Sequence, residues 1–95
     1  MEKNYYVYIL TNYSQSTFYT GVTSDLIKRM FEHQNKLVKS FSAKYNLYRL
    51  VYYKIHSSIE QAIKREKLLK RWSRVSKINL IKKDNPEFND LSQSW

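Results

Sequence analysis

The fold of this chain is decided between Tyr5 and Gln34, where the sequence reads YYVYILTNYSQSTFYTGVTSDLIKRMFEHQ. Two runs rich in aromatic and β-branched residues, 5–10 and 18–22, flank a polar segment, which is the pattern of a β-hairpin. The first run is apolar on both of its faces, so helices are expected to cover both faces of the sheet. The only glycine of the chain, Gly21, lies in the second run. A glycine inside a strand indicates a bulge or a place where another group approaches the backbone closely.

A helix is expected to follow the hairpin, because apolar residues then recur at spacings of three and four. Ser24 is the expected N-cap of this helix, and Lys39 lies near its expected end. The stripe that this helix is expected to bury consists of Leu26, Met30, His33 and Leu37.

The second half of the chain alternates strand and helix patterns. Residues 48–56, which read YRLVYYKIH, predict a third strand. Ser57 and Glu60 match a capping box, so a second long helix is expected from there to about Trp72. A shorter helix is expected over residues 73–83, ending before the single proline of the chain. The expected fold is an α/β domain with a small three-stranded, mainly antiparallel sheet flanked by helices, in the order β-β-α-β-α-α.

Length and composition limit the class of protein. A chain of 95 residues is expected to form one domain, residues 1–95, with a core over about 5–91. The absence of cysteine excludes disulfides, thiolate zinc sites and cysteine nucleophiles. No apolar run reaches the roughly 18 residues of a membrane span, and the N-terminus lacks signal-peptide features. We therefore expect a cytoplasmic protein with no membrane partner.

The charge of the chain indicates the kind of partner. Seventeen lysines and arginines against eight acidic residues give a net charge of +9, and 16% of the residues are aromatic. Basic charge combined with aromatic rings is typical of proteins that bind nucleic acid. A solvated basic surface or a ribosome-associated protein has the same composition, so charge alone leaves these alternatives open.

Glu66 occupies an unusual position on the second helix. The stripe expected to be buried on that helix consists of Ile59, Ala62, Ile63, Glu66 and Leu69. An ionised carboxylate in such a stripe is costly unless it is paired or bound to a metal. Two interpretations stay open: a salt bridge to Arg65, Lys70 or an arginine of another element, and a functional carboxylate.

Spacing also brings polar side chains together on the first helix and in the hairpin. Arg29 and His33 are four residues apart, hence on one face of the helix. Tyr8 and Tyr19 are expected to present two hydroxyls beside the bare backbone of Gly21, where glycine would leave space for the phenols and a phosphate. The structural alternatives are a packed core histidine, an arginine that reaches solvent and tyrosines that pack the sheet.

Five motifs of the chain follow one another in the order found in a known family. They are YVY at 6–8, YTG at 19–21, TSDLIKRMFEH at 23–33, AIKREKLLKRW at 62–72 and LIKKDNPEF at 80–88. With these motifs the chain resembles the GIY-YIG nuclease superfamily, and in particular its small stand-alone bacterial branch, related to the nuclease module of the excision-repair endonuclease. The similarity covers Tyr5 to about Leu91. Tyr6 and Thr20 depart from the pattern, since they stand where the family has its first glycine and its central isoleucine.

The resemblance implies a metal-dependent endonuclease that nicks DNA or another nucleic acid through one active site. Glu66 would hold one Mg²⁺ or Mn²⁺ ion against the scissile phosphate, since such ions take oxygen ligands. Arg29 would stabilise the developing charge with its planar guanidinium. One tyrosine would help to deprotonate the attacking water, with Tyr8 favoured in this role and Tyr19 as the group that positions water or phosphate.

Two further site residues follow from the same resemblance. His33 would support the tyrosine base or contact the phosphate. The late asparagine of the family corresponds to Asn85, with Asn79 as the alternative.

The binding surface is expected on and near the helix that carries Glu66, because seven of the fourteen residues from 64 to 77 are lysine or arginine. Within this run, Trp72 either packs against the third helix or offers a face for base stacking. We expect nucleic acid as the partner, with DNA favoured over RNA, and a monomer or weak homodimer. The alternative is a module that binds nucleic acid with little or no cutting. The expected nucleic-acid-binding residues are Lys28, Lys36, Lys39, Lys64, Lys67, Lys70, Arg71, Trp72 and Arg74.

Overall fold

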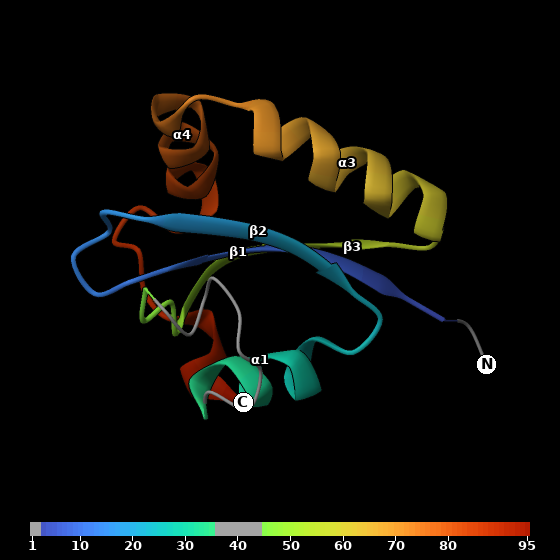
Figure 1. Cartoon of the computed structure of the whole chain (residues 1–95), viewed down its shortest axis with the longest axis horizontal. Helices are drawn as coiled ribbons and strands as arrows, with labels where there is room; N and C mark the ends of the chain where they lie inside the picture. Colours follow the sequence, from blue (N-terminus) through green and yellow to red (C-terminus); the bar gives the residue numbers. More distant parts are fainter. Residues whose placement is uncertain (1–2, 36–44) are drawn as a thin grey trace.

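A three-stranded sheet with helices on both faces forms the body of the protein (Figure 1). The computed structural model describes residues 3–35 and 45–95. In chain order the elements are β1 (Tyr5–Thr11), β2 (Phe18–Thr23), α1 (Leu26–Gln34), β3 (Arg49–His56), α3 (Ile59–Arg71), α4 (Arg74–Asp84) and a short 3-10 helix, η1 (Leu91–Ser94). The α/β fold and the order β-β-α-β-α-α expected from the sequence are confirmed.

The strand β1 is the centre of the sheet, which has the order β2-β1-β3 with both pairs antiparallel. The last five residues of β1 are buried. Tyr8 lies opposite Gly21 on β2 and opposite Tyr53 on β3. Because directly paired residues of antiparallel strands point to the same face, Tyr8 and Gly21 share one side of the sheet.

The two faces of the sheet are covered by different helices, as Figure 1 shows: α3 and α4 lie on one face and α1 on the other. The apolar cluster between the sheet and α3 and α4 contains Val7, Ile9, Val51, Tyr52, Ala62, Leu69, Ile81 and Phe88. The cluster on the α1 face contains Tyr8, Leu10, Leu26, Met30, Leu47 and Leu50. Cover on both faces, expected because β1 is apolar on both sides, is thus observed.

Both helix N-caps expected from the sequence are wrong by one residue. Asp25, and not Ser24, caps α1, because its carboxylate accepts a hydrogen bond from the backbone N–H three residues further on, at 3.1 Å. Ser58, and not Ser57, caps α3 in the same manner, at 3.4 Å. In both places two neighbouring residues carry a side-chain oxygen that can cap a helix, so the local pattern does not choose between them.

The ends of the helices agree with the sequence only in part. The helix α1 ends at Gln34, with Asn35 as its C-cap. Leu37 and Lys39, assigned to the end of this helix, lie outside the described residues. The short helix α4 ends at Asp84, directly before the asparagine that precedes the proline, as expected. None of the helices within residues 3–35 and 45–95 combines the length and the apolar character needed to cross a membrane.

Candidate active site

Gly21 is required by the two tyrosines beside it. A Cβ atom at this position would lie 2.5 Å from Tyr8 Oη, 2.6 Å from Tyr8 Cζ and 3.0 Å from Tyr19 Cε1. The backbone of Gly21 has no positive φ, so its conformation does not call for glycine. The residue is therefore a glycine because of space: the Tyr8 phenol lies directly against the β2 backbone.

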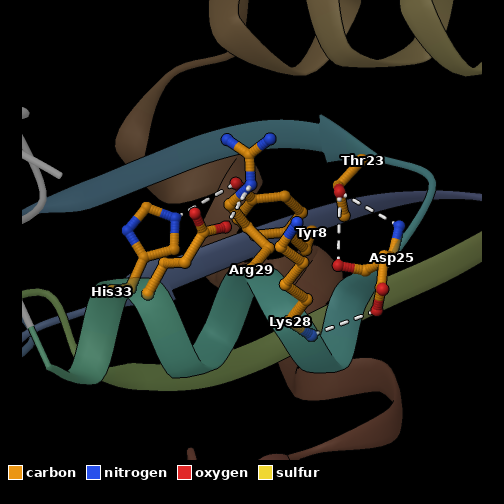
Figure 2. A network of polar contacts seen from close by, with 7 residues as sticks. Tyr8, Thr23, Asp25, Lys28, Arg29 and His33 are labelled. Carbon is orange, nitrogen blue, oxygen red and sulfur yellow. Dashed lines mark hydrogen bonds and ion pairs between the residues drawn. The ribbon is translucent and has the colours of Figure 1, made fainter. Parts of the chain in front are cut away.

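Three aromatic rings meet on the α1 face of the sheet. The ring centroids of Tyr8 and Tyr19 are 6.3 Å apart, those of Tyr8 and His33 are 6.0 Å apart, and those of Tyr19 and His33 are 5.9 Å apart. Tyr8 Oη lies 3.3 Å from His33 Nε2 (Figure 2). Tyr8 and His33 are buried, with exposed fractions of 0% and 3%, whereas Tyr19 is partly exposed.

Burial favours the neutral forms of both Tyr8 and His33. Burial raises the pKa of the Tyr8 phenol well above its usual value, and Tyr19 adds to the rise while the positive charge of Arg29 opposes it. Burial, followed by the positive charge of Arg29, lowers the pKa of His33. In the tautomer that carries its proton on Nδ1, the neutral imidazole accepts a hydrogen bond from the Tyr8 hydroxyl at Nε2.

Arg29 brings a positive charge to this cluster from α1. Its side chain rises from the helix alongside Tyr8 (Figure 2) and is 41% exposed. Arg29 Nε lies 3.8 Å from Glu32 Oε1. The sequence reasoning missed this acidic neighbour, although its spacing of three residues is a recognisable signal for a pair on one helix.

The start of α1, which sets the position of Arg29 and His33, is held to the end of β2. The backbone N–H of Asp25 donates to Thr23 Oγ1 at 3.1 Å, and the Thr23 hydroxyl donates to the Asp25 carbonyl at 3.3 Å (Figure 2). These bonds tie the helix to the strand that carries Tyr19 and Gly21.

Glu66 approaches from the other face of the sheet, on α3. Its side chain is 14% exposed, and Oε1 lies 2.9 Å from Lys70 Nζ. The negative charge of Glu66 is the smallest of the contributions that raise the pKa of Tyr8. Of the salt bridges left open by the sequence, the one to Lys70 is observed. Arg65, a second of the candidates, instead lies over the Trp72 ring at 5.3 Å.

The buried stripe expected around Glu66 is wrong at two positions. Ile59 and Ile63 are 42% and 36% exposed, while Ala62 and Leu69 are completely buried. The helix therefore packs on a narrower face than expected, because only α3 residues directly above the sheet reach its core. Glu66 lies at the border of that face, where its carboxylate can meet solvent.

Glu66 is the residue whose chemistry fits a divalent cation. Among the described residues, no three His, Cys, Asp or Glu side chains come together as a possible metal site. One carboxylate is enough for a hard cation that keeps several waters and takes its other ligands from a phosphate. In the structure this carboxylate is paired with the Lys70 ammonium at 2.9 Å, so a cation would have to replace that partner.

Asn85 is engaged within the fold. It is 5% exposed, and its Nδ2 donates to the Val51 carbonyl at 3.1 Å and to the Asn89 carbonyl at 2.9 Å. Its Oδ1 accepts from the Asn89 N–H at 2.9 Å. This geometry fastens the end of α4 to β3, and the catalytic contact expected of Asn85 stays a prediction. The alternative, Asn79, is exposed on α4.

Four of the expected basic residues gather on α3. A hollow of about 490 Å³ on the surface of α3 is lined by Lys64, Lys67, Leu68, Lys70 and Arg71. We call it the basic hollow. Lys28 is exposed on α1, next to Arg29, whereas Lys36 and Lys39 lie outside the described residues.

Arg74 and Trp72 are occupied by contacts within the protein. The Arg74 guanidinium donates to the Ser16 carbonyl at 2.9 Å and also to the Gln15 carbonyl, and it lies over the Phe18 ring. It therefore holds the β1–β2 turn against α4. Trp72 packs against the core beneath α3 and α4, which is the structural alternative of the two left open. These contacts do not favour phosphate binding by Arg74 or base stacking on Trp72.

A small antiparallel sheet on which two phenols, a histidine and an arginine gather, with a carboxylate on the helix of its other face, forms a candidate hydrolase site. Residues 4–79 match the family described as the GIY-YIG catalytic domain. The chain therefore belongs to the GIY-YIG family, whose catalytic domains are nuclease domains and act on nucleic acid.

The relatives of the chain are UPF0213 proteins. One from Syntrophus aciditrophicus is 42% identical over 91 residues, which cover 92% of this chain and 98% of that protein. Another, from Staphylococcus saprophyticus, is 32% identical over 81 residues, or 85% of this chain and 96% of that one. The solution NMR structure of the UPF0213 protein BH0048 from Bacillus halodurans matches with a TM-score of 0.59 and 28% identity over 95% of both chains. The resemblance to small stand-alone GIY-YIG proteins is thus confirmed.

Proposed function

We propose that the whole chain acts as a divalent-metal-dependent endonuclease that nicks DNA through one active site. The observation that carries this proposal is the convergence at Tyr8: its ring centroid lies 6.3 Å from that of Tyr19 and 6.0 Å from that of His33. The positive charge of Arg29 lowers the pKa of this phenol, and the negative charge of Glu66 raises it slightly. A surface that only binds a polyanion gains nothing from an acidic residue such as Glu66. A carboxylate that holds a divalent cation against a phosphate contributes to hydrolysis.

Arg29 is proposed to bind the scissile phosphate. Its guanidinium is partly exposed and is held only loosely by Glu32, at 3.8 Å, so it is available to an incoming anion. Two parallel N–H groups match two phosphate oxygens, and they contact the charge that develops as the bond breaks.

Glu66 is proposed to hold one Mg²⁺ or Mn²⁺ ion. When bound, a divalent cation would supply positive charge to the phosphate. Without the cation, the protein offers the phosphate only the positive charge of Arg29 and of lysines. The bound cation would also neutralise the Glu66 carboxylate, so that the carboxylate would not repel the anionic substrate.

The two tyrosines are proposed to have different roles. Tyr8 is completely buried, its pKa is raised, and its hydroxyl contacts His33, so it is poorly suited to take a proton from water directly. Tyr19 is partly exposed and lies against both rings. We therefore assign the water-facing phenol to Tyr19, in place of the Tyr8 favoured from the sequence. Tyr8 and His33 form the neutral support that fixes the Tyr19 ring.

Substrate and location extend the proposal. DNA is proposed over RNA because of the resemblance to the excision-repair nuclease module. A monomer has one such site and cuts one strand per encounter, so it leaves nicks and not double-strand breaks. The cytoplasm is the proposed compartment, in keeping with a sequence that contains no cysteine.

The burial of Tyr8 favours one rival, a protein that binds nucleic acid without cutting it. A nicking assay decides between the two. Purified protein is incubated with supercoiled plasmid, branched DNA, single-stranded DNA and RNA, each with EDTA, Mg²⁺ or Mn²⁺. We expect metal-dependent nicks in the wild type and a loss of about 10²- to 10³-fold in Glu66→Gln, with substrate binding retained.

The assay also tests the roles of the tyrosines. Tyr19→Phe should lose more activity than Tyr8→Phe, because only Tyr19 is placed to meet water. Cleavage that persists in EDTA, or a Glu66→Gln variant with wild-type activity, would overturn the metal-dependent mechanism. Tight binding without any cleavage would establish the rival.

A further inference from the structure

Lys70 lies between the candidate metal ligand and the basic hollow. Its ammonium contacts Glu66 Oε1 at 2.9 Å, while the same side chain lines the hollow together with Lys64, Lys67 and Arg71. The Lys70 side chain is 53% exposed, whereas the Glu66 side chain is only 14% exposed. The lysine therefore has solvent around it into which it can turn, while the carboxylate is largely enclosed.

In the metal-free protein, the position of Lys70 reduces the repulsion between the Glu66 carboxylate and a phosphate. A carboxylate at the edge of a phosphate-binding surface repels the phosphate, and the repulsion is strong where the carboxylate is partly desolvated. An ammonium in contact with that carboxylate cancels most of its charge. While it does so, however, the ammonium is not available to a phosphate.

We propose that Lys70 exchanges between two sites: it pairs with Glu66 when no divalent cation is bound, and it joins the basic hollow and binds a backbone phosphate when a cation occupies the carboxylate. This inference rests on the proposed function, because it assigns the cation to Glu66. It makes cation binding and nucleic-acid binding cooperative through a residue of the chain itself, in addition to any contact between cation and phosphate.

The exchange has a reciprocal consequence that can be measured. If a cation at Glu66 strengthens nucleic-acid binding by freeing Lys70, nucleic acid must strengthen cation binding by the same factor. Lys70 and the cation compete for one carboxylate, so removal of Lys70 must tighten cation binding even though nucleic acid is absent.

The first test measures Mn²⁺ binding without nucleic acid. The broadening of backbone amide signals around Glu66 is followed by NMR during a Mn²⁺ titration of the wild type, K70Q and K67Q. Lys67 is the matched control, since it lines the same hollow while Glu66 pairs with Lys70. We expect K70Q to lower the Mn²⁺ Kd by about two- to five-fold, the range expected for release of an ion pair of this kind, and K67Q to change it less. An equal or weaker affinity in K70Q overturns the exchange.

The second test measures nucleic-acid binding in EDTA, where no cation contributes. The affinity of a labelled duplex oligonucleotide is compared for the wild type, E66Q, K70Q and the double variant. We expect E66Q to tighten binding by about two- to five-fold when Lys70 is present, because the lysine is released, and by clearly less in the K70Q background. Equal effects of E66Q in both backgrounds would show that Glu66 acts only through its overall charge, and would overturn the inference.

Neither measurement depends on cleavage. A protein that binds nucleic acid but never nicks it would end the proposed function, while the Mn²⁺ titration and the cycle of variants would still report on Lys70. Conversely, a metal-dependent nuclease in which K70Q leaves the Mn²⁺ Kd unchanged would keep the proposed function and lose the exchange.

Discussion

The two faces of the sheet differ in how their polar groups are buried and paired. On the α1 face, Tyr8 and His33 are buried and neutral, and a hydroxyl-to-imidazole hydrogen bond at 3.3 Å joins them. On the α3 face, Glu66 pairs with the half-exposed ammonium of Lys70 at 2.9 Å. The polar groups named on the α1 face are thus packed in the core, whereas those on the α3 face form an ion pair with a solvent-exposed partner.

This difference suggests that the candidate site divides its work between the faces. Changes among the buried residues of the α1 face, Gly21, Tyr8 and His33, should act through packing and should depend little on salt. Changes on the α3 face should act through charge and should depend strongly on salt, because exposed charges are screened within about 10 Å at 0.1 M ionic strength. The four variants below test this division, and they are ordered by the size of the expected effect.

Gly21→Ala should have the largest effect, because the new Cβ would lie 2.5 Å from Tyr8 Oη and 2.6 Å from Cζ. The phenol ring is rigid and fully buried, so it must be displaced as a whole, which breaks its hydrogen bond with His33. We expect cleavage to disappear and the free energy of unfolding to fall by about 1–3 kcal/mol, the cost typical of an overpacked core. Urea denaturation and the nicking assay measure the two quantities.

Salt provides the control for Gly21→Ala. If packing is the cause, the loss of cleavage should be the same at low and high ionic strength. Recovery of cleavage at low salt would mean that the buried residues of the α1 face also affect cleavage through charge. The division between the faces would then be wrong.

Arg29→Lys should reduce the cleavage rate by about 10- to 100-fold although the charge is kept, because lysine cannot form the bidentate contact with phosphate. The rate is measured in single turnover at saturating substrate, so that weaker binding does not contribute. A wild-type rate would show that Arg29 serves the ion pair with Glu32 at 3.8 Å and not the substrate.

The basic hollow should control affinity with little effect on the rate at saturation. Changing Lys64, Lys67 and Arg71 together to Gln should weaken binding to all sequences alike. It should also flatten the log-log dependence on salt by roughly 0.7–0.9 for each phosphate that the variant no longer neutralises. Lys70 is kept in this variant because it pairs with Glu66.

The matched control for the basic hollow removes the same charge elsewhere. Lys3, Lys54 and Lys82 are exposed and lie outside the hollow, so changing these three to Gln gives the same net charge. An equal flattening of the salt dependence in both triple variants would mean that only net charge matters.

The sequence predicted the parts of this molecule that depend on local pattern. The apolar β1 implied cover on both faces, and the single glycine implied a close approach to the backbone; the two core clusters and the position of the Tyr8 phenol agree with this. Local pattern was weaker where neighbours are chemically equivalent. It predicted Ser24 and Ser57 as helix caps, whereas Asp25 and Ser58 are observed.

Contacts between segments far apart in the chain could not be predicted from the sequence. A motif match assigned Asn85 to catalysis, but its hydrogen bonds to Val51 and Asn89 follow from how α4 docks on β3. Composition placed Arg74 on the binding surface, although the guanidinium reaches the β1–β2 turn across the fold. The i, i+4 pair of Glu66 and Lys70 was accessible from spacing, whereas its position beside the basic hollow was not.

Thr20 gives the smallest effect and the sharpest contrast, since it is the chain neighbour of Gly21 and points to the opposite face. It is 3% exposed, and no hydrogen-bond partner of its Oγ1 is found within residues 3–35 and 45–95. A buried hydroxyl without a partner costs free energy, and valine has nearly the same shape without that cost. Thr20→Val should therefore raise the free energy of unfolding by about 1 kcal/mol, measured by urea denaturation. Cleavage should stay unchanged, because Thr20 shares the α3 face with Ile9, its partner on β1, and not the face of the Tyr8 phenol. A less stable variant would show that an ordered water satisfies the hydroxyl, and a variant with altered cleavage would show that the α3 face also shapes the tyrosine site.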